Sequence, residues 1–70
     1  MNAGKMLNEA MDNDVRVAIN YHDSFGVSMT TAPVIVDRVD SDFVYFYRSD
    51  NSGRLASIWL DHIDAIYPEV

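Results

Sequence analysis

Apolar and polar positions alternate along five short stretches of the chain, and each stretch predicts a β-strand. In residues 15–21 the odd-numbered positions are apolar or aromatic, whereas Arg16 and Asn20 lie among the even-numbered ones. This period of two is typical of a half-buried strand. Residues 43–47 are strongly β-prone because aromatic and branched side chains fit a pleated surface. The other predicted strands cover residues 34–39, 55–60 and 63–67.

Residues 2–13 carry a different pattern, with apolar side chains at helical spacing. Met6, Leu7, Ala10 and Met11 fall on one stripe of a helix. Ala, Met, Leu, Lys and Glu are also good helix formers. The pattern predicts a short N-terminal helix that ends at residues 13–14. We expect this helix to be a structural cap over the strands, rather than a surface for binding a partner.

Turn residues separate the predicted strands. Residues 22–26, 40–42 and 50–53 are rich in Asp, Asn, Ser and Gly. Residues 61–62 predict a further turn, which could be one turn of 3₁₀ helix. Pro33 cannot donate a ladder hydrogen bond, so it marks an edge, a bulge or a strand start. A helix followed by five short antiparallel strands predicts a mostly β fold, in which a strongly bent sheet closes into a small barrel.

The length of the chain limits it to a single domain, residues 1–70. A domain of this size buries only about 60% of its unfolded surface. The chain has no cysteine, so disulfides cannot add stability, and oligomerisation is the usual remaining device. No apolar run approaches the roughly 20 residues of a membrane span, and the N-terminus does not resemble a signal peptide. We expect a cytoplasmic protein with no membrane partner.

The net charge and the absence of catalytic motifs limit the classes of function that the sequence supports. Eleven acidic residues against five basic ones give a net charge of −6. Nucleic-acid affinity comes largely from Lys and Arg that release counterions, so generic nucleic-acid binding is disfavoured. The sequence contains no glycine-rich phosphate loop, Walker signature or nucleophile motif. His22, Asp23 and Ser24 have the residue types of a hydrolase triad, but sequential neighbours in a loop rarely reach triad geometry. We therefore expect no enzyme activity.

Asp61, His62 and Asp64 are residue types that bind cations. Zinc usually takes three or four good ligands, and these three side chains need not point the same way. In a ring of copies, one His or Asp from each subunit could still bind a cation at the central pore. A solvated turn is the favoured interpretation, and neither a metal nor another cofactor is predicted.

The closing segment, residues 58–68, carries a resemblance to a known family. Ile58 and Ile63 are followed by an apolar strand that contains Ile66 and stops at Pro68. This ending resembles the second motif of the Sm-like family, and most of all that of its bacterial Hfq branch. Residues 36–44 resemble the strand, acidic turn and strand of the first motif. The resemblance covers nearly the whole chain and implies an SH3-like barrel of five bent antiparallel strands with a short N-terminal helix.

Members of the Sm-like family form closed rings, and the resemblance implies one here. Strand four of one subunit pairs with strand five of the next, which removes both sheet edges. We expect a homo-oligomeric ring of five to seven subunits. Trp59 is the expected anchor, since Trp is enriched at interface hot spots. The candidate subunit-interface residues are Ile58, Trp59, Ile63 and Ile66.

Hfq proteins bind U-rich RNA around the pore, and the resemblance implies where such contacts would lie. Phe43 matches the aromatic that stacks on a base, an interaction of roughly 1–3 kcal/mol. Asp42 holds the position of a polar amide, and His62 lies one place beyond that of the family histidine. Arg48 and Arg54 flank the predicted turn and could touch the RNA backbone. The leading hypothesis is a non-catalytic ring that binds single-stranded RNA or an RNA-handling protein.

A second hypothesis rests on the charge and on a missing lysine. Aligned on Ile63, the positions of the family's Lys-His pair hold Leu60 and Asp61. The chain also resembles, less closely, a small acidic inhibitor that binds the transcription terminator Rho and shares the Sm-like barrel. The alternative is therefore an acidic protein-interaction module without direct RNA binding. It would be a regulator or inhibitor of an RNA-handling protein, with a viral source as one option.

Overall fold

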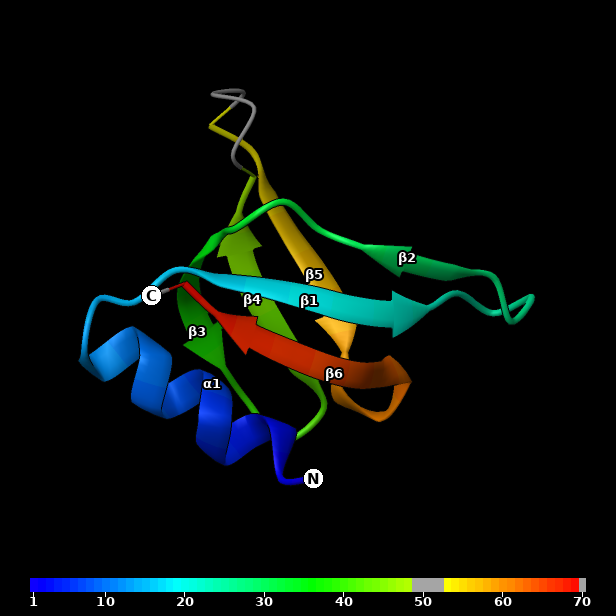
Figure 1. Cartoon of the computed structure of the whole chain (residues 1–70), viewed down its shortest axis with the longest axis horizontal. Coiled ribbons are helices and arrows are strands. Elements are labelled where there is room, and N and C mark those ends of the chain that lie inside the picture. Colours follow the sequence, from blue (N-terminus) through cyan, green and yellow to red (C-terminus); the bar gives the residue numbers. More distant parts are fainter. Residues whose placement is uncertain (49–52, 70) are drawn as a thin grey trace.

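The structure is a computed structural model that describes residues 1–48 and 53–69. Within these residues it contains one α-helix, six β-strands and one 3₁₀ turn (Figure 1). In chain order they are α1 (Ala3–Asp12), β1 (Val17–His22), β2 (Ser28–Thr30), β3 (Ile35–Val39), β4 (Phe43–Tyr47), β5 (Leu55–Trp59), η1 (Leu60–His62) and β6 (Ile63–Pro68).

Most of the predicted elements are confirmed, with small shifts at their ends. β4 covers the predicted residues 43–47, while β5 ends one residue earlier and β6 one residue later than predicted. β1 begins two residues later than predicted, at Val17. The turn at residues 61–62 is part of the 3₁₀ turn η1, as predicted. The predicted turn over residues 50–53 lies largely outside the described residues.

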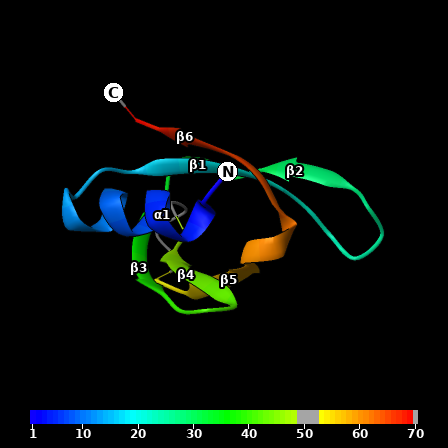
Figure 2. The ribbon, with the colours of Figure 1, turned by 90° about the horizontal axis from the view of Figure 1, so that it is seen from below.

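Helix α1 closes one end of the two layers of strands. The Asn2 side chain accepts the backbone N–H of Lys5 at 3.0 Å and so caps the helix N-terminus. Leu7 and Ala10, from the predicted apolar stripe, are buried. The helix packs against β3 and β6 (Figure 2). This position agrees with the predicted structural cap.

The strands form two small antiparallel sheets. One sheet has the order β2-β1-β6 and the other the order β3-β4-β5, and Figure 2 shows them as two facing layers. An isolated bridge between Val17 and Val34 joins the layers on one side. In the described part of the chain, β5 pairs only with β4, and β6 pairs only with β1. Each of these strands therefore has one edge without a strand neighbour.

The predicted closed barrel of five strands is wrong for the described residues, which form two sheets and an additional strand, β2. Pro33 lies in the segment between β2 and β3, where the chain leaves β1 and crosses to β4. There the Thr31 hydroxyl accepts the backbone N–H of Ile19 at 3.0 Å, so a side chain replaces a ladder partner. The coarser prediction, a mostly β fold with a short N-terminal helix, is confirmed.

One hydrophobic core lies between the sheets and under the helix. Alternate residues of the strands point into it, as the period of two predicts. Among the described residues no polar or charged side chain is buried. No described helix is long and apolar enough to cross a membrane. The buried apolar residues are Leu7, Ala10, Val17, Ile19, Val34, Val36, Val44, Phe46, Ile58, Ile63 and Ile66.

Candidate functional site

The outward face of β4 and β5 carries aromatic side chains. Phe43 lies opposite Trp59 in the register of the two strands, and their ring centroids are 4.0 Å apart at an interplanar angle of 36°. Such a pair contributes about 0.5–1.5 kcal/mol beyond the burial of its area. Trp59 remains 49% exposed and Phe43 is half-buried. The pair therefore presents an aromatic surface to solvent.

The 3₁₀ turn η1 extends this surface toward the end of β1. It places the His62 ring 6.5 Å from that of Trp59, and 4.9 Å from that of His22 in a stacked arrangement. The backbone N–H of Leu60 donates to the Asp42 carbonyl at 2.8 Å. This hydrogen bond holds η1 against the turn that precedes β4, so His62 lies at a fixed place beside the aromatic pair.

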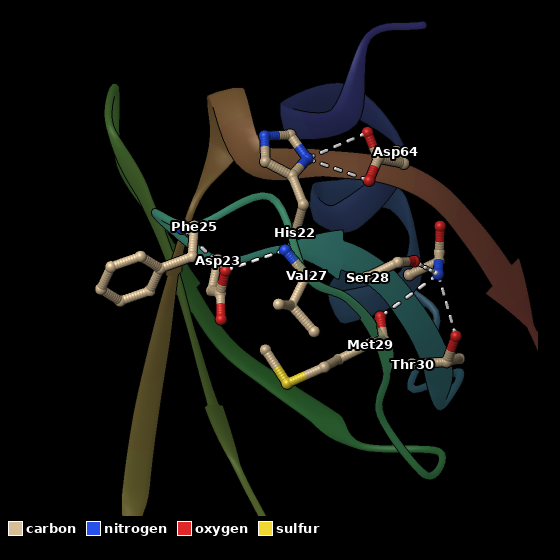
Figure 3. A network of polar contacts seen from close by, with 9 residues as sticks. His22, Asp23, Phe25, Val27, Ser28, Met29, Thr30 and Asp64 are labelled. Carbon is tan, nitrogen blue, oxygen red and sulfur yellow. Dashed lines mark hydrogen bonds and ion pairs between the residues drawn. The ribbon is translucent and has the colours of Figure 1, made fainter.

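Asp64 lies at the His22 end of the row of rings. Nδ1 of His22 is 3.0 Å and 3.2 Å from the two carboxylate oxygens of Asp64 (Figure 3). The pairing of β1 with β6, in which Tyr21 lies opposite Ile63, brings these residues together. The side chains are 37% and 47% exposed, so the ion pair that forms when His22 is protonated contributes only about 0–1 kcal/mol. Its role is to orient the His22 ring.

Tyr45 and Arg38 lie at the other end of the row. The Tyr45 ring centroid is 6.0 Å from that of Phe43, and the Arg38 guanidinium carbon lies 4.4 Å from the Tyr45 centroid. This is a cation–π contact between neighbouring strands. We call the five rings of Tyr45, Phe43, Trp59, His62 and His22 the ring platform.

Carboxylates border the ring platform. Asp42 and Asp61 are exposed neighbours of Phe43 and His62 in the chain, and Asp64 contacts His22. Asp40 accepts the backbone N–H groups of Phe43 at 2.7 Å and of Asp42 at 2.9 Å. These two hydrogen bonds, that from Phe43 first, lower the pKa of Asp40 because they favour its charged form. Asp64 and Asp40 therefore lie beside the ring platform, and Asp42 and Asp61 are exposed in the turns next to Phe43 and His62.

A shallow groove runs beside the ring platform. It has a volume of about 200 Å³ and lies between the end of β1 and the C-terminal half of β5. Phe43, Trp59, His62 and His22 all line it. This volume is below the ~300–1,000 Å³ of small-molecule pockets, so the groove suits a side chain or a flat ring better than a whole ligand.

The structure separates the predicted RNA contacts into two groups. Phe43 and His62 belong to the ring platform, and Asp42 borders it. Arg48 and Arg54 lie at the opposite end of the β4–β5 hairpin, where the Arg48 backbone N–H donates to the Arg54 carbonyl at 3.4 Å. Five residues of strand separate Phe43 from Arg48, a distance of about 17 Å. Within one subunit, the arginines therefore do not join the aromatic site.

Three of the four predicted interface residues pack into the hydrophobic core of their own subunit. Ile58, Ile63 and Ile66 are 7–8% exposed and belong to the core. Only their backbone is left for contact with another chain. Trp59 is the exception, because its ring lies on the outer face of β5. Its predicted role at a subunit interface stays a prediction.

The residues of the suspected triad do not converge. The Asp23 carboxylate accepts the backbone N–H groups of Phe25 and Val27, at 2.8 Å and 2.9 Å, instead of contacting His22. His22 contacts Asp64 from the other end of the sequence. The described residues contain no group of three or more His, Cys, Asp or Glu that could hold a metal ion.

His22 and Tyr45 are the members of the ring platform that were not predicted as site residues, and His22 is the harder of the two to find from the sequence. Its role depends on a contact with Asp64 and a stack on His62, both about forty residues away in the chain. The local pattern around His22, a turn-rich stretch, gives no sign of either contact. The signal that could have found it is the strand pairing, since His22 ends the strand that lies beside β6.

The chain matches no protein-family model, no curated protein and no solved structure.

Proposed function

We propose that this chain is a non-catalytic protein-interaction module whose ring platform binds arginine or lysine side chains of a partner protein. The observation that carries the proposal is the acidic border of an exposed aromatic surface. The proposal develops the acidic interaction module that the sequence offers as an alternative. An RNA-handling protein is a suitable partner because it presents Lys and Arg to phosphates.

The chemistry of the ring platform suits a cation. A Lys or Arg over an aromatic face gains about 0.5–1 kcal/mol at an exposed site, and about 2 kcal/mol when it is desolvated. Arg38 over Tyr45 is one such contact within the chain. A guanidinium also pairs with carboxylates through two parallel hydrogen bonds, and Asp42 and Asp61 are exposed next to the rings. A basic segment would therefore find both kinds of contact on one surface.

The single tryptophan of the chain, Trp59, provides the readout for a binding test. A short oligoarginine peptide is titrated into the protein while Trp59 fluorescence is recorded. We expect a saturable change that weakens with added salt, a smaller change with oligolysine, and none with oligoglutamate. Absence of a saturable change with oligoarginine at low salt would rule out the proposed cation site.

Two matched double variants separate the ring platform from the general acidity of the chain. Asp42→Asn with Asp61→Asn removes two charges beside the rings, and Glu9→Gln with Asp12→Asn removes two charges from α1. We expect the first pair to weaken oligoarginine binding several-fold and the second pair to leave it within about twofold. An equal loss in both would mean that the peptide senses net charge alone.

Binding of single-stranded RNA is the second candidate function, and one observation favours it. Phe43, which the Sm-like resemblance assigns to base stacking, packs against Trp59 in a row that includes His62. Aromatic rows of this kind accept unpaired bases at roughly 1–3 kcal/mol per base. Fluorescence anisotropy with short U-rich and A-rich RNA at low salt tests this candidate. No binding at tens of micromolar protein would eliminate it.

Ring assembly remains a proposal as well, and the free strand edges support it. β5 and β6 correspond to the strands that the Sm-like resemblance pairs between subunits, and each has one edge without a strand partner among the described residues. Pairing of such edges removes a source of aggregation. Native mass spectrometry is the test: a discrete species of five to seven copies is expected, and a monomer at high protein concentration would contradict it.

A further inference from the structure

The β1–β2 hairpin ends in a loop that exposes one large apolar side chain. Phe25 is 93% exposed, and the hairpin extends away from the body of the molecule (Figure 1). In Figure 3 the ring points away from the strands of the hairpin. A single exposed phenylalanine is unfavourable in water, where burial of such a side chain gains about 1.5–3 kcal/mol.

The loop around Phe25 is well ordered by hydrogen bonds. One carboxylate oxygen of Asp23 accepts the backbone N–H groups of both Phe25 and Val27. The Asp23 N–H donates to the Val27 carbonyl, and the Gly26 N–H donates to the Asp23 carbonyl, both at 3.0 Å. Gly26 has a φ of 82°, a conformation that favours glycine. The turn therefore fixes the backbone at Phe25, on a loop where its side chain is 93% exposed.

A cavity of about 280 Å³ with a mixed polar and apolar wall opens elsewhere on the same chain. It lies between the two sheets, beneath the segment that connects β2 to β3. The Arg48 side chain is exposed and lies at this cavity. The volume is just below that of small-ligand pockets, which start at ~300 Å³, and leaves room for one aromatic side chain. The apolar part of its wall is formed by Tyr21, Ala32, Val34, Phe46, Ala56 and Ile58.

We propose that Phe25 of one copy of this chain inserts into the cavity of a second copy. The size matches one phenyl ring, and the apolar part of the wall offers that ring a contact surface. Charge also matches: Asp23 is next to the inserting residue and Arg48 is at the cavity. In a chain with a net charge of −6, two copies repel each other at long range, so a local acid–base match decides which faces can meet.

The contact is heterologous, because the inserting residue and the cavity are different surfaces of the chain. Each copy gives its Phe25 to one neighbour and receives that of another, which produces a closed ring or an open row of copies. This contact does not rest on the proposed binding of basic partners. It also differs from the β5–β6 edge pairing, which uses backbone groups and leaves Phe25 in solvent.

Removal of the aromatic side chain is the first test. The self-association of the unmodified chain, Phe25→Ala and the control Ile35→Ala is measured by sedimentation velocity over a concentration series. Ile35 is also more than half exposed but lies on β3, away from the loop and the cavity. We expect Phe25→Ala to weaken association roughly tenfold or more, as loss of an aromatic anchor does, and Ile35→Ala to leave it unchanged. Equal association of the three proteins, or a monomeric unmodified chain, would overturn the proposal.

Complementation is the decisive test of a heterologous contact. Ala32→Trp fills the mouth of the cavity but keeps Phe25, whereas Phe25→Ala keeps the cavity but lacks the side chain that enters it. Each variant alone is expected to lose the association that insertion of Phe25 gives, and their mixture to form pairs with one copy of each, which native mass spectrometry detects by mass. Circular dichroism confirms beforehand that both variants are folded. A mixture without such mixed pairs, or self-association of Phe25→Ala as strong as that of the unmodified chain, contradicts insertion.

The charge match is tested separately. Asp23→Asn keeps an oxygen that can accept the two backbone N–H groups but removes the charge beside Phe25. We expect self-association to weaken a few-fold at low salt and the difference to disappear at high salt. Unchanged self-association at low salt would show that Asp23 and Arg48 do not meet, and would exclude this orientation of the contact.

Discussion

The two ends of the β4–β5 hairpin differ in charge and in chemistry although they belong to the same pair of strands. At one end Phe43 stacks on Trp59, and carboxylates surround the rings. At the other end Arg48 and Arg54 lie opposite each other, beside a groove of about 610 Å³ that both of them line. Five residues of strand, about 17 Å, separate the ends.

This separation changes the interpretation of the predicted RNA site. A nucleotide stacked on Phe43 would lie at the acidic end of the hairpin, while Arg48 and Arg54, which could neutralise its phosphate, lie at the far end. A basic side chain at the aromatic end meets attraction from the carboxylates at that end. The acidic end is therefore suited to a cation, and the basic end to an anionic group or to Asp23 of a neighbouring copy.

Reversal of the charge at the aromatic end is expected to have the largest effect. Asp42→Lys with Asp61→Lys adds two charges per site, so the net charge of −6 becomes −2. We expect oligoarginine affinity to fall more than tenfold, about 1.4 kcal/mol, and affinity for U-rich RNA to rise. Isothermal titration calorimetry measures the first, and fluorescence anisotropy the second. Unchanged oligoarginine affinity would show that the peptide binds elsewhere.

A comparison of two β5 substitutions tests the aromatic surface itself. Trp59 and Leu55 are both about half exposed but lie at opposite ends of β5. Trp59→Ala removes the stack with Phe43 and is expected to weaken oligoarginine binding several-fold, with a loss of about 0.5–1.5 kcal/mol in the free energy of unfolding. Leu55→Ala is expected to change the free energy of unfolding by about 0.5 kcal/mol or less, and binding not at all. Calorimetry and urea unfolding provide both readouts.

The elements that sequence reasoning could predict are those with local causes. The alternation in residues 43–47 and the helical stripe at residues 6–11 each determine an element without help from distant residues, and both elements formed as predicted. Phe43 and His62 were candidates because each resembles a residue of a family motif, and both lie on the ring platform. Burial of Ile58, Ile63 and Ile66 also follows from local alternation, while their role at a subunit interface stays a prediction.

What could not be predicted depends on pairing between distant segments. The stack of His22 on His62 requires β1 to lie beside β6 and η1 to have one particular geometry. The pairing of Phe43 with Trp59 depends on the register of β4 with β5, in which these two residues lie opposite each other. Residues 28–39 form two strands, β2 and β3, because the strand is interrupted near Pro33. A proline alone is compatible with either a bent strand or an interrupted one.

Asp40→Ala is expected to have an effect of intermediate size, and the effect concerns the stability of the turn at the acidic end of the hairpin. Two backbone hydrogen bonds lower the pKa of Asp40 below its ordinary value of 3.8, so the folded state favours the charged carboxylate. The charged Asp40 carboxylate stabilises the fold fully at pH values above its ordinary pKa. This stabilisation is lost as the pH falls through the lowered pKa of Asp40 in the folded state. Asp40→Ala is therefore expected to be less stable than the unmodified chain at neutral pH, with the difference shrinking toward the acid end. Urea unfolding at a series of pH values measures this.

A control for the Asp40 prediction is Asp12→Ala, at the end of α1, for which no comparable pair of backbone hydrogen bonds is found in the described structure. Its difference in unfolding free energy from the unmodified chain should show less dependence on pH between neutral and acid conditions. A pH dependence of Asp40→Ala no larger than that of Asp12→Ala would contradict the role of the turn hydrogen bonds.

The smallest effect on binding is expected at the basic end, and it separates the two surfaces most directly. Arg48→Gln removes a charge about 17 Å along the strand from Phe43, so oligoarginine affinity should change less than twofold. The same substitution removes the basic partner proposed for Asp23 of a second copy, so self-association should weaken a few-fold at low salt. The opposite pattern, with peptide binding altered and self-association intact, would mean that the two ends of the hairpin act as one site. The paired measurements on a single variant therefore decide whether the acidic and basic ends are independent.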